Sequence, residues 1–133
     1  MIIDSSALMT ILFAEPEAKV FAEAIEDAQR RSLSAANFLE AAIVVDGRHD
    51  PIISRRFDDF LDEAGITVES VDLEQVTIAR AAYRDFGKGS GHPARLNFGD
   101  CFAYALARQR GEPLLFKGND FCHTDIASVL QQD

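Results

Sequence analysis

The stretch MIIDSSAL, residues 1–8, combines a short apolar run, an acid and two hydroxyl residues. Residues 1–3 are typical of a short buried strand that ends at Asp4. Ser5 or Ser6 can cap a helix that follows directly. The stretch therefore predicts a β–α unit that places a carboxylate at the carboxyl end of its strand.

The rest of the chain continues this alternation of strands and helices. Apolar residues near the 3.6 period indicate helices, and short apolar or alternating runs indicate strands. Pro16 suits the first turn of a second helix. The expected further helices are 37–47, 51–65, 73–86 and 100–110, and the expected strands are 32–34 (or an extended connection), 66–71 (half-buried) and 113–116. This order predicts an α/β fold with a mostly parallel sheet and helices on both faces.

Length and composition exclude several classes of protein. The 133 residues fit one domain, residues 1–133, and 47% hydrophobic residues are enough for a packed core. Two cysteines form neither a disulfide framework nor a zinc site, as expected of a cytoplasmic protein. No apolar run approaches the roughly 20 residues of a membrane span, and the first residues lack the basic region of a signal peptide.

The net charge of −9, from 13 Lys and Arg against 22 Asp and Glu, argues against a nucleic-acid binder. However, an enzyme that binds metal cations needs acids for them. Local basic patches also matter more than the total charge. The charge balance therefore leaves a metal-dependent nuclease open.

Four acids fall where an α/β fold gathers functional side chains. Asp4 follows the first expected strand and Asp120 the last, while Asp100 starts a helix and Glu40 lies in the first turns of another. Ligands of parallel sheets bind outside the carboxyl ends of the strands, so all four can converge. Two such charges at 4 Å repel by about 4 kcal/mol at an effective dielectric near 20. A magnesium ion, which prefers oxygen ligands, attracts both carboxylates and so offsets their mutual repulsion.

Each acid also has a purely structural interpretation. Asp4 could cap the following helix, Asp100 could be a favourable charge at a helix start, and Asp120 could be a turn residue. Glu40 stands three residues after Asn37, which is the spacing of a capping pair. Only the combination of the four, in this order, favours a metal site.

With these residues in view, the sequence resembles the PIN-domain family, and within it the VapC-like toxins of bacterial toxin–antitoxin pairs. The resemblance spans almost the whole chain. The stretches that carry it are IIDSSAL around Asp4, ANFLEAA around Glu40, LNFGDCFAYALA around Asp100 and LLFKGND ending at Asp120. The last stretch departs from the Thr-x-Asn pattern that many relatives have before the final aspartate.

The resemblance implies a PIN-like three-layer α/β/α sandwich and a Mg²⁺- or Mn²⁺-dependent endoribonuclease. Asp4 and Asp100 would be the principal metal ligands, Glu40 and Asp120 would complete the acidic cluster and position water, and Ser6 would support the first aspartate. The resemblance further implies a homodimer and a cognate VapB-like antitoxin. The C-terminal segment of that antitoxin would block the active site within a toxin–antitoxin hetero-oligomer.

Basic residues stand where RNA contacts would be useful. Arg80, Arg84 and Lys88 are spaced i, i+4 and i+8, and they lead into a glycine-rich loop that continues to Arg95; Lys117 lies close to Asp120 in sequence. One interpretation is a set of phosphate contacts that do not read sequence. The alternative is a solvated helix face.

Two other functions remain open from the sequence. Asp4-Ser5-Ser6 with Lys117 faintly resembles an aspartyl phosphatase of the haloacid-dehalogenase type. A catalytically inert PIN-like module that only binds proteins is the other possibility. Cleavage of RNA in the presence of Mn²⁺, release of phosphate from small esters, or neither would separate the three.

Overall fold

The structure, a computed structural model, describes residues 1–130, so the expected domain boundary at 133 lies outside the described residues. A parallel four-stranded sheet has the strand order β3-β2-β1-β4. Its strands are β1 (Ile2–Ile3), β2 (Ser32–Ser34), β3 (Thr67–Glu69) and β4 (Leu114–Leu115). The expected parallel sheet is confirmed, and residues 32–34 are a strand rather than a connection.

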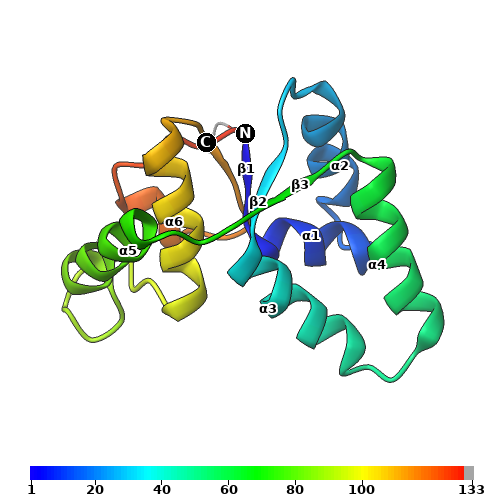
Figure 1. Ribbon diagram of the computed structural model, residues 1–133, viewed down its shortest axis with the longest axis horizontal. Helices are drawn as coiled ribbons and strands as arrows, with labels where there is room; N and C mark the ends of the chain where they lie inside the picture. Colours follow the sequence, from blue (N-terminus) through cyan, green and yellow to red (C-terminus); the bar gives the residue numbers. More distant parts are fainter. Residues whose placement is uncertain (131–133) are drawn as a thin grey trace.

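Helices cover both faces of the sheet (Figure 1). One face carries α5 (Leu73–Phe86) and α6 (Phe98–Arg110). The other carries α1 (Ser5–Leu12), α2 (Ala18–Asp27), α3 (Ala35–Asp46) and α4 (Pro51–Glu63). The 3₁₀-helix η1 (Asp120–His123) follows β4. This is the α/β/α sandwich that the sequence predicts.

The two-layer core follows from the alternation of side chains along each strand. Ile2 and Leu114 pack with α5 and α6, whereas their neighbours Ile3 and Leu115 pack with α1 to α4. All four side chains are at most 1% exposed. Because both faces are covered, these strands are apolar throughout, as is typical of parallel sheets.

Several helix starts differ from the sequence prediction: α2 begins at Ala18, beyond Pro16, and α6 begins at Phe98 instead of residue 100. Asp4, not Ser5 or Ser6, caps α1, since its carboxylate accepts from the Ser6 N–H. Ser34 caps α3, which therefore begins before Asn37. The expected capping pair of Asn37 and Glu40 is thus wrong, and both side chains are available for another purpose.

Some apolar residues of the predicted helix faces are exposed. In α3, the side chains of Leu39 and Ile43 are 58% and 62% exposed. In α5, those of Val76 and Tyr83 are 45% and 46% exposed. The periodicity correctly gave the helices, but part of each apolar face has no partner within residues 1–130. Strand β3 is also more exposed than the half-buried strand expected at 66–71.

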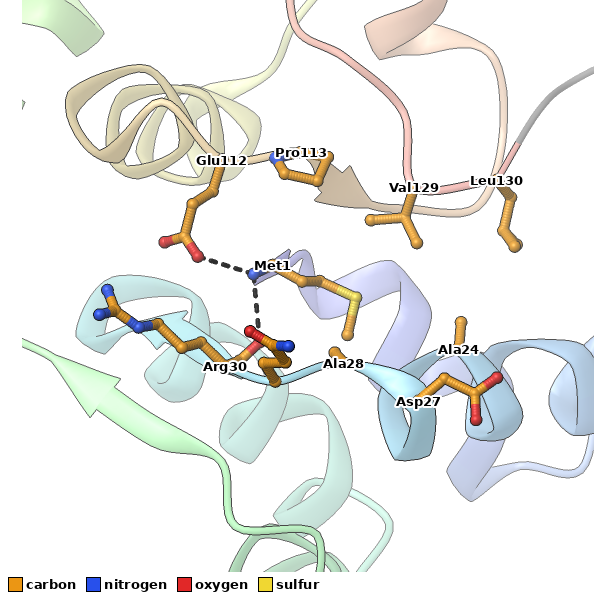
Figure 2. Close-up of a pocket in the computed structure, with 10 residues that line it drawn as sticks. Met1, Ala24, Asp27, Ala28, Arg30, Glu112, Pro113, Val129 and Leu130 are labelled. Carbon is orange, nitrogen blue, oxygen red and sulfur yellow. Dashed lines mark hydrogen bonds and ion pairs between the residues drawn. The ribbon is translucent and has the colours of Figure 1, made fainter.

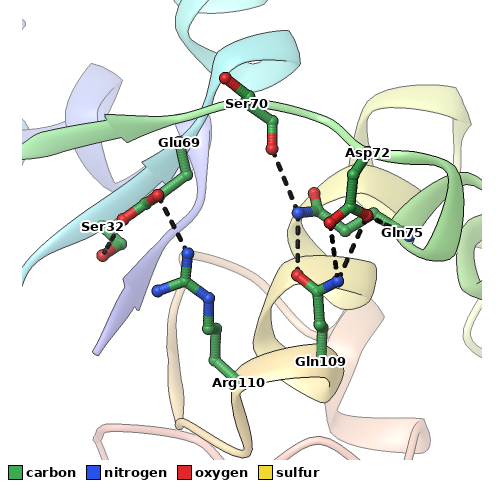
Figure 3. Close-up of polar contacts among 7 residues, drawn as sticks. All are labelled: Ser32, Glu69, Ser70, Asp72, Gln75, Gln109 and Arg110. Carbon is green, nitrogen blue, oxygen red and sulfur yellow. Dashed lines mark hydrogen bonds and ion pairs between the residues drawn. The ribbon is translucent and has the colours of Figure 1, made fainter.

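A polar network ties α5 to α6 behind the edge strand (Figure 3). The buried Gln75 side chain donates to the Ser70 carbonyl at 3.2 Å and to Gln109 Oε1 at 2.9 Å. Gln109 in turn donates to the carboxylate of Asp72, which caps α5. These bonds fix the connection from β3 into α5, and so hold α5 against α6.

Candidate active site

The carboxyl ends of the central strands open into a pocket of about 310 Å³. The chain leaves β1 at Asp4, β2 at the start of α3, and β4 toward η1, so three connections meet at one edge. The pocket brings together six of the residues that the sequence nominated: Asp4, Ser6, Glu40, Asp100, Lys117 and Asp120. The predicted convergence of the four acids is therefore present.

A larger pocket of about 600 Å³ lies at the opposite edge of the sheet (Figure 2). There the amino group of Met1 pairs with Glu112 at 2.8 Å and donates to the Arg30 carbonyl at 3.1 Å. Its acids are thus partly neutralised, and it lies at the amino ends of the strands. The smaller acidic pocket is the better candidate because ligands of parallel sheets bind at the carboxyl edge.

Asp4 is the most deeply buried of the four acids, at 3% exposure. Its Oδ2 accepts from the Ser6 hydroxyl at 2.5 Å and from the Ser6 N–H at 3.1 Å. Its Oδ1 is also buried, yet it accepts no hydrogen bond from residues 1–130. The pKa of Asp4 is raised from 3.8 to about 6, chiefly by burial and to a smaller extent by the nearby Glu40, against the lowering effect of the hydrogen bonds from Ser6.

Asp100 stands in the first turn of α6 within a capping box. Its N–H donates to the Asn97 side chain at 2.8 Å, and its own Oδ2 accepts from the Asn97 N–H at 2.9 Å. The pKa of Asp100 is raised to about 7, chiefly by burial and in addition by the carboxylates of Asp4, Asp120 and Glu40. The capping box at the start of α6 thus holds the Asp100 carboxylate close to the other three acids.

Glu40 is held by residues of three different elements. The Ser5 hydroxyl donates to its Oε1 at 2.5 Å, and the Asn37 amide approaches the same oxygen at 3.4 Å. The fully buried Asn37 also donates to the Gly99 carbonyl at 2.9 Å. A Cβ at position 99 would lie 2.0 Å from Glu40 Oε2, so the carboxylate reaches the pocket only because residue 99 is glycine.

Asp120 begins η1 and is exposed at the mouth of the pocket. The preceding residues are anchored by Phe116 and Phe121, whose buried rings lie 5.1 Å apart. Lys117 also lines the pocket, but its ammonium pairs with Glu15 and lies 3.7 Å from Glu17. It is therefore already neutralised by two acids.

The donor set suits a hard divalent cation. Asp4 Oδ1 is a buried carboxylate oxygen without a partner among the described residues. Burial raises the pKa values of Asp4 and Asp100, and the neighbouring carboxylates add a smaller contribution in the same direction. No three acid, histidine or cysteine side chains in residues 1–130 are arranged to surround an ion by themselves. Magnesium does not need that, because it commonly binds one or two carboxylates and keeps several waters.

The expected RNA-binding residues do not all reach this pocket. Arg80, Arg84, Lys88 and Arg95 are exposed, but none of them lines it. Arg84 pairs with Asp85 at 3.3 Å in solvent. They lie on α5 and on the loop that leads to the start of α6.

Three supporting residues escaped the sequence prediction. Asn97 was recognisable, because Asn97 and Asp100 have the N-cap to N3 spacing of a capping box. Asn37 and Gly99 act through a contact between α3 and α6, 62 residues apart in sequence. No local pattern could have shown it.

A PIN-domain family model matches residues 1–127. The chain belongs to the PIN-domain family. This PIN domain is 54% identical to Ribonuclease VapC28 of Mycobacterium tuberculosis over 132 residues, which are 99% of each chain. It is 52% identical to Ribonuclease VapC42 of the same organism over 126 residues, 95% of this chain and 96% of the relative. The chain is accordingly a VapC-like PIN-domain protein of the nuclease class.

Solved structures agree with this fold. The M. tuberculosis toxin VapC20, described as a sarcin-ricin loop cleaving toxin, superimposes with a TM-score of 0.73 at 14% identity over 95% of each chain. A toxin–antitoxin complex from Klebsiella pneumoniae gives a TM-score of 0.74 at 15% identity over 98% of each chain. The family assignment also decides against the aspartyl phosphatase, since the matched model and relatives are PIN domains.

Proposed function

We propose that this PIN domain is the toxin of a type II toxin–antitoxin pair and cuts RNA as a metal-dependent endoribonuclease at the acidic pocket. The observation that carries the proposal is the buried Asp4 Oδ1, which has no hydrogen-bond partner among residues 1–130 and lies in a pocket with three further acids. Without a cation such crowding is costly, whereas a divalent ion offsets it. Names of the relatives at 54% and 52% identity support RNA as the substrate.

Asp4 and Asp100 would hold the ion, with Glu40 and Asp120 facing it across the pocket. When bound, Mg²⁺ or Mn²⁺ would make a water more acidic and stabilise charge on the phosphodiester. Ser6 keeps Asp4 Oδ2 engaged, so that Oδ1, which has no partner among residues 1–130, would be left to bind the ion. Ser5 and Asn37 hold Glu40 at the pocket, where its carboxylate could accept the proton of an attacking water.

Lys117 at the rim is already paired with Glu15 and Glu17, so substrate contacts outside the pocket would come mainly from the exposed Arg80, Arg84, Lys88 and Arg95. Such contacts bind phosphates without reading sequence, and they compensate locally for the net charge of −9. RNA as the substrate also agrees with a cytoplasmic location. In residues 1–130 no helix has the length and apolar content required to cross a bilayer.

A protein partner is supported by apolar side chains beside the pocket. Leu39, Ile43, Val44 and Phe98 are exposed, Phe98 at 77%, and they line a hollow of about 540 Å³ that also reaches Glu40. Exposed apolar patches of this kind mark interaction sites. A homodimer and a cognate VapB-like antitoxin are the partners that we propose for this surface. The solved toxin–antitoxin neighbour has the same fold.

The deciding experiment incubates the purified chain with mixed RNA and Mn²⁺, and maps the new 5′ ends by sequencing. Asp4→Asn and Asp100→Asn should abolish cleavage, since each removes a charge from the cation site while preserving side-chain shape. Cleavage by either variant at the parent rate would refute the assignment of metal ligands. A wild-type chain that neither cuts RNA nor releases phosphate would instead indicate an inert binding module.

A further inference from the structure

Lys117 attaches the segment between β4 and η1 at two points, one on α1 and one in the corner between α1 and α2. Its backbone N–H donates to the Ser6 hydroxyl oxygen at 3.0 Å, and its ammonium pairs with Glu15. The same Ser6 hydroxyl donates to Asp4 Oδ2 at 2.5 Å. A continuous chain of contacts therefore runs from Glu15, through Lys117 and Ser6, to the acid at the bottom of the pocket.

The structure holds Glu15 in place for this contact. Its Oε2 also accepts from the hydroxyl of Thr10, which is 1% exposed, and its N–H donates to the Thr10 carbonyl at 3.0 Å. The preceding residue, Ala14, has φ 51°, in the left-handed region that side chains with a Cβ avoid. Such conformations persist only where the surroundings enforce them. The corner between α1 and α2 thus turns sharply to direct Glu15 back over α1.

Stability alone does not account for this pair. The side chains of Lys117 and Glu15 are 40% and 37% exposed, and ion pairs in such positions contribute little to folding. In this state Lys117 is not free to bind a phosphate, because Glu15 and Glu17 already neutralise it. What the pair does determine is where the backbone of residue 117 lies relative to Ser6.

We propose that Glu15 is a positioning residue of the acidic site, which acts through Lys117 to hold the 116–120 segment against Ser6. This contact keeps the Ser6 hydroxyl directed at Asp4, and it sets the position from which Asp120 enters the pocket. Glu15 itself touches neither the cation nor RNA. The inference rests on the proposed cation site and adds a residue to it that lies outside the pocket.

We call the contact of Lys117 with Glu15 and Ser6 the tether. Substitution of Lys117 distinguishes the tether from a purely electrostatic effect of the lysine charge. If Lys117 acted only as a nearby positive charge, then Lys117→Met would tighten the binding of a cation. If Lys117 instead holds the segment in place, the same change weakens cation binding. For Glu15→Gln both explanations predict weaker binding, so Glu17→Gln serves as the matched control for loss of one nearby carboxylate.

The experiment titrates the full chain with Mn²⁺ in the absence of RNA and follows free Mn²⁺ by its electron paramagnetic resonance signal. We expect Glu15→Gln and Lys117→Met each to weaken Mn²⁺ binding about tenfold, the loss typical of residues that orient metal ligands. Glu17→Gln should change it less than twofold. The double variant Glu15→Gln/Lys117→Met should bind no more weakly than either single variant, because both changes break one contact.

Lys117→Arg supplies a rescue, since a guanidinium can still reach Glu15, and it should bind Mn²⁺ within about twofold of the parent. The tether is refuted if Lys117→Met binds Mn²⁺ as tightly as the parent or more tightly. It is equally refuted if Glu15→Gln and Glu17→Gln have equal effects. Asp4→Asn, titrated alongside, locates any failure: if it binds Mn²⁺ like the parent, the cation site itself is wrong.

Discussion

Asp4→Asn should make the metal-free protein more stable at neutral and alkaline pH. A carboxyl group whose pKa rises on folding favours the folded state only while it is protonated. Its contribution to the free energy of unfolding is therefore complete below the pKa of the unfolded chain, and it is lost as the pH rises through the pKa of the folded protein. For Asp4 these values are 3.8 and about 6. The folded protein therefore loses stability from about pH 4 upward, and the loss is complete above about pH 7.

The pKa values set the magnitude. A rise from 3.8 to about 6 corresponds to about 3 kcal/mol at pH 8, and to about half of that at pH 5. Asparagine has nearly the same shape, carries no charge and is an equally good N-cap, so Asp4→Asn should regain most of this free energy. For a domain of this size, that gain raises the unfolding temperature by on the order of 10 °C.

Thermal unfolding followed by circular dichroism in EDTA, at pH 8 and pH 5, measures the effect. Asp59→Asn, which removes an exposed carboxylate from α4, is the control and should change little. Addition of Mn²⁺ should stabilise the parent and not Asp4→Asn, because only the parent retains the ligand. An Asp4→Asn protein that unfolds at or below the parent temperature at pH 8 in EDTA would contradict the argument, as would a gain that is equal at the two pH values.

Four further changes probe the supports of the site. Gly99→Ala should displace the Glu40 carboxylate, because its Oε2 would lie 2.0 Å from the new Cβ. The rate of RNA cleavage should fall by at least tenfold, and the free energy of unfolding in urea should fall by roughly 1–3 kcal/mol. An unchanged cleavage rate would show that Glu40 is dispensable. Asn37→Ala removes the buried side-chain hydrogen bond to the Gly99 carbonyl and should cost about 0.5–1.5 kcal/mol, which chemical unfolding would detect. Ala14→Gly should stabilise the fold by roughly 0.5–1 kcal/mol by relieving the left-handed alanine, and a loss of stability would rule out strain there. Arg84→Ala should weaken RNA binding and reduce the slope of log affinity against log salt by about 1, whereas an unchanged slope would remove this residue from the RNA surface.

Local sequence was enough for the elements and for the edge at which the acids meet. Helix periodicity located α5 at residues 73–86 without error, and the apolar runs located β1 and β4. These predictions succeed because period and strand alternation depend on near neighbours in the chain. Parallel strands place their carboxyl ends at one edge, so the positions of Asp4 and Asp120 after their strands already implied a shared pocket.

The helix ends were less certain, because several residues compete to cap each one. Asp4 and the two serines after it can all cap α1, and only the folded geometry selects Asp4. Its carboxylate has one oxygen engaged by Ser6 and the other left without a partner among the described residues. Asp4 thus caps the helix and also keeps one carboxylate oxygen that could bind a cation, so the two roles that the sequence presented as alternatives are compatible.

The sequence by itself determined the parallel α/β architecture, the four acids and the edge at which they gather, since each depends on patterns within one element or on strand direction. Only the tertiary structure decided how those acids are held. Glu40 depends on Asn37 and Gly99, which meet across α3 and α6, and the 116–120 segment depends on Glu15, 102 residues away from Lys117. Contacts between distant segments arise from packing the whole chain. Their geometry therefore has no signature in any local stretch.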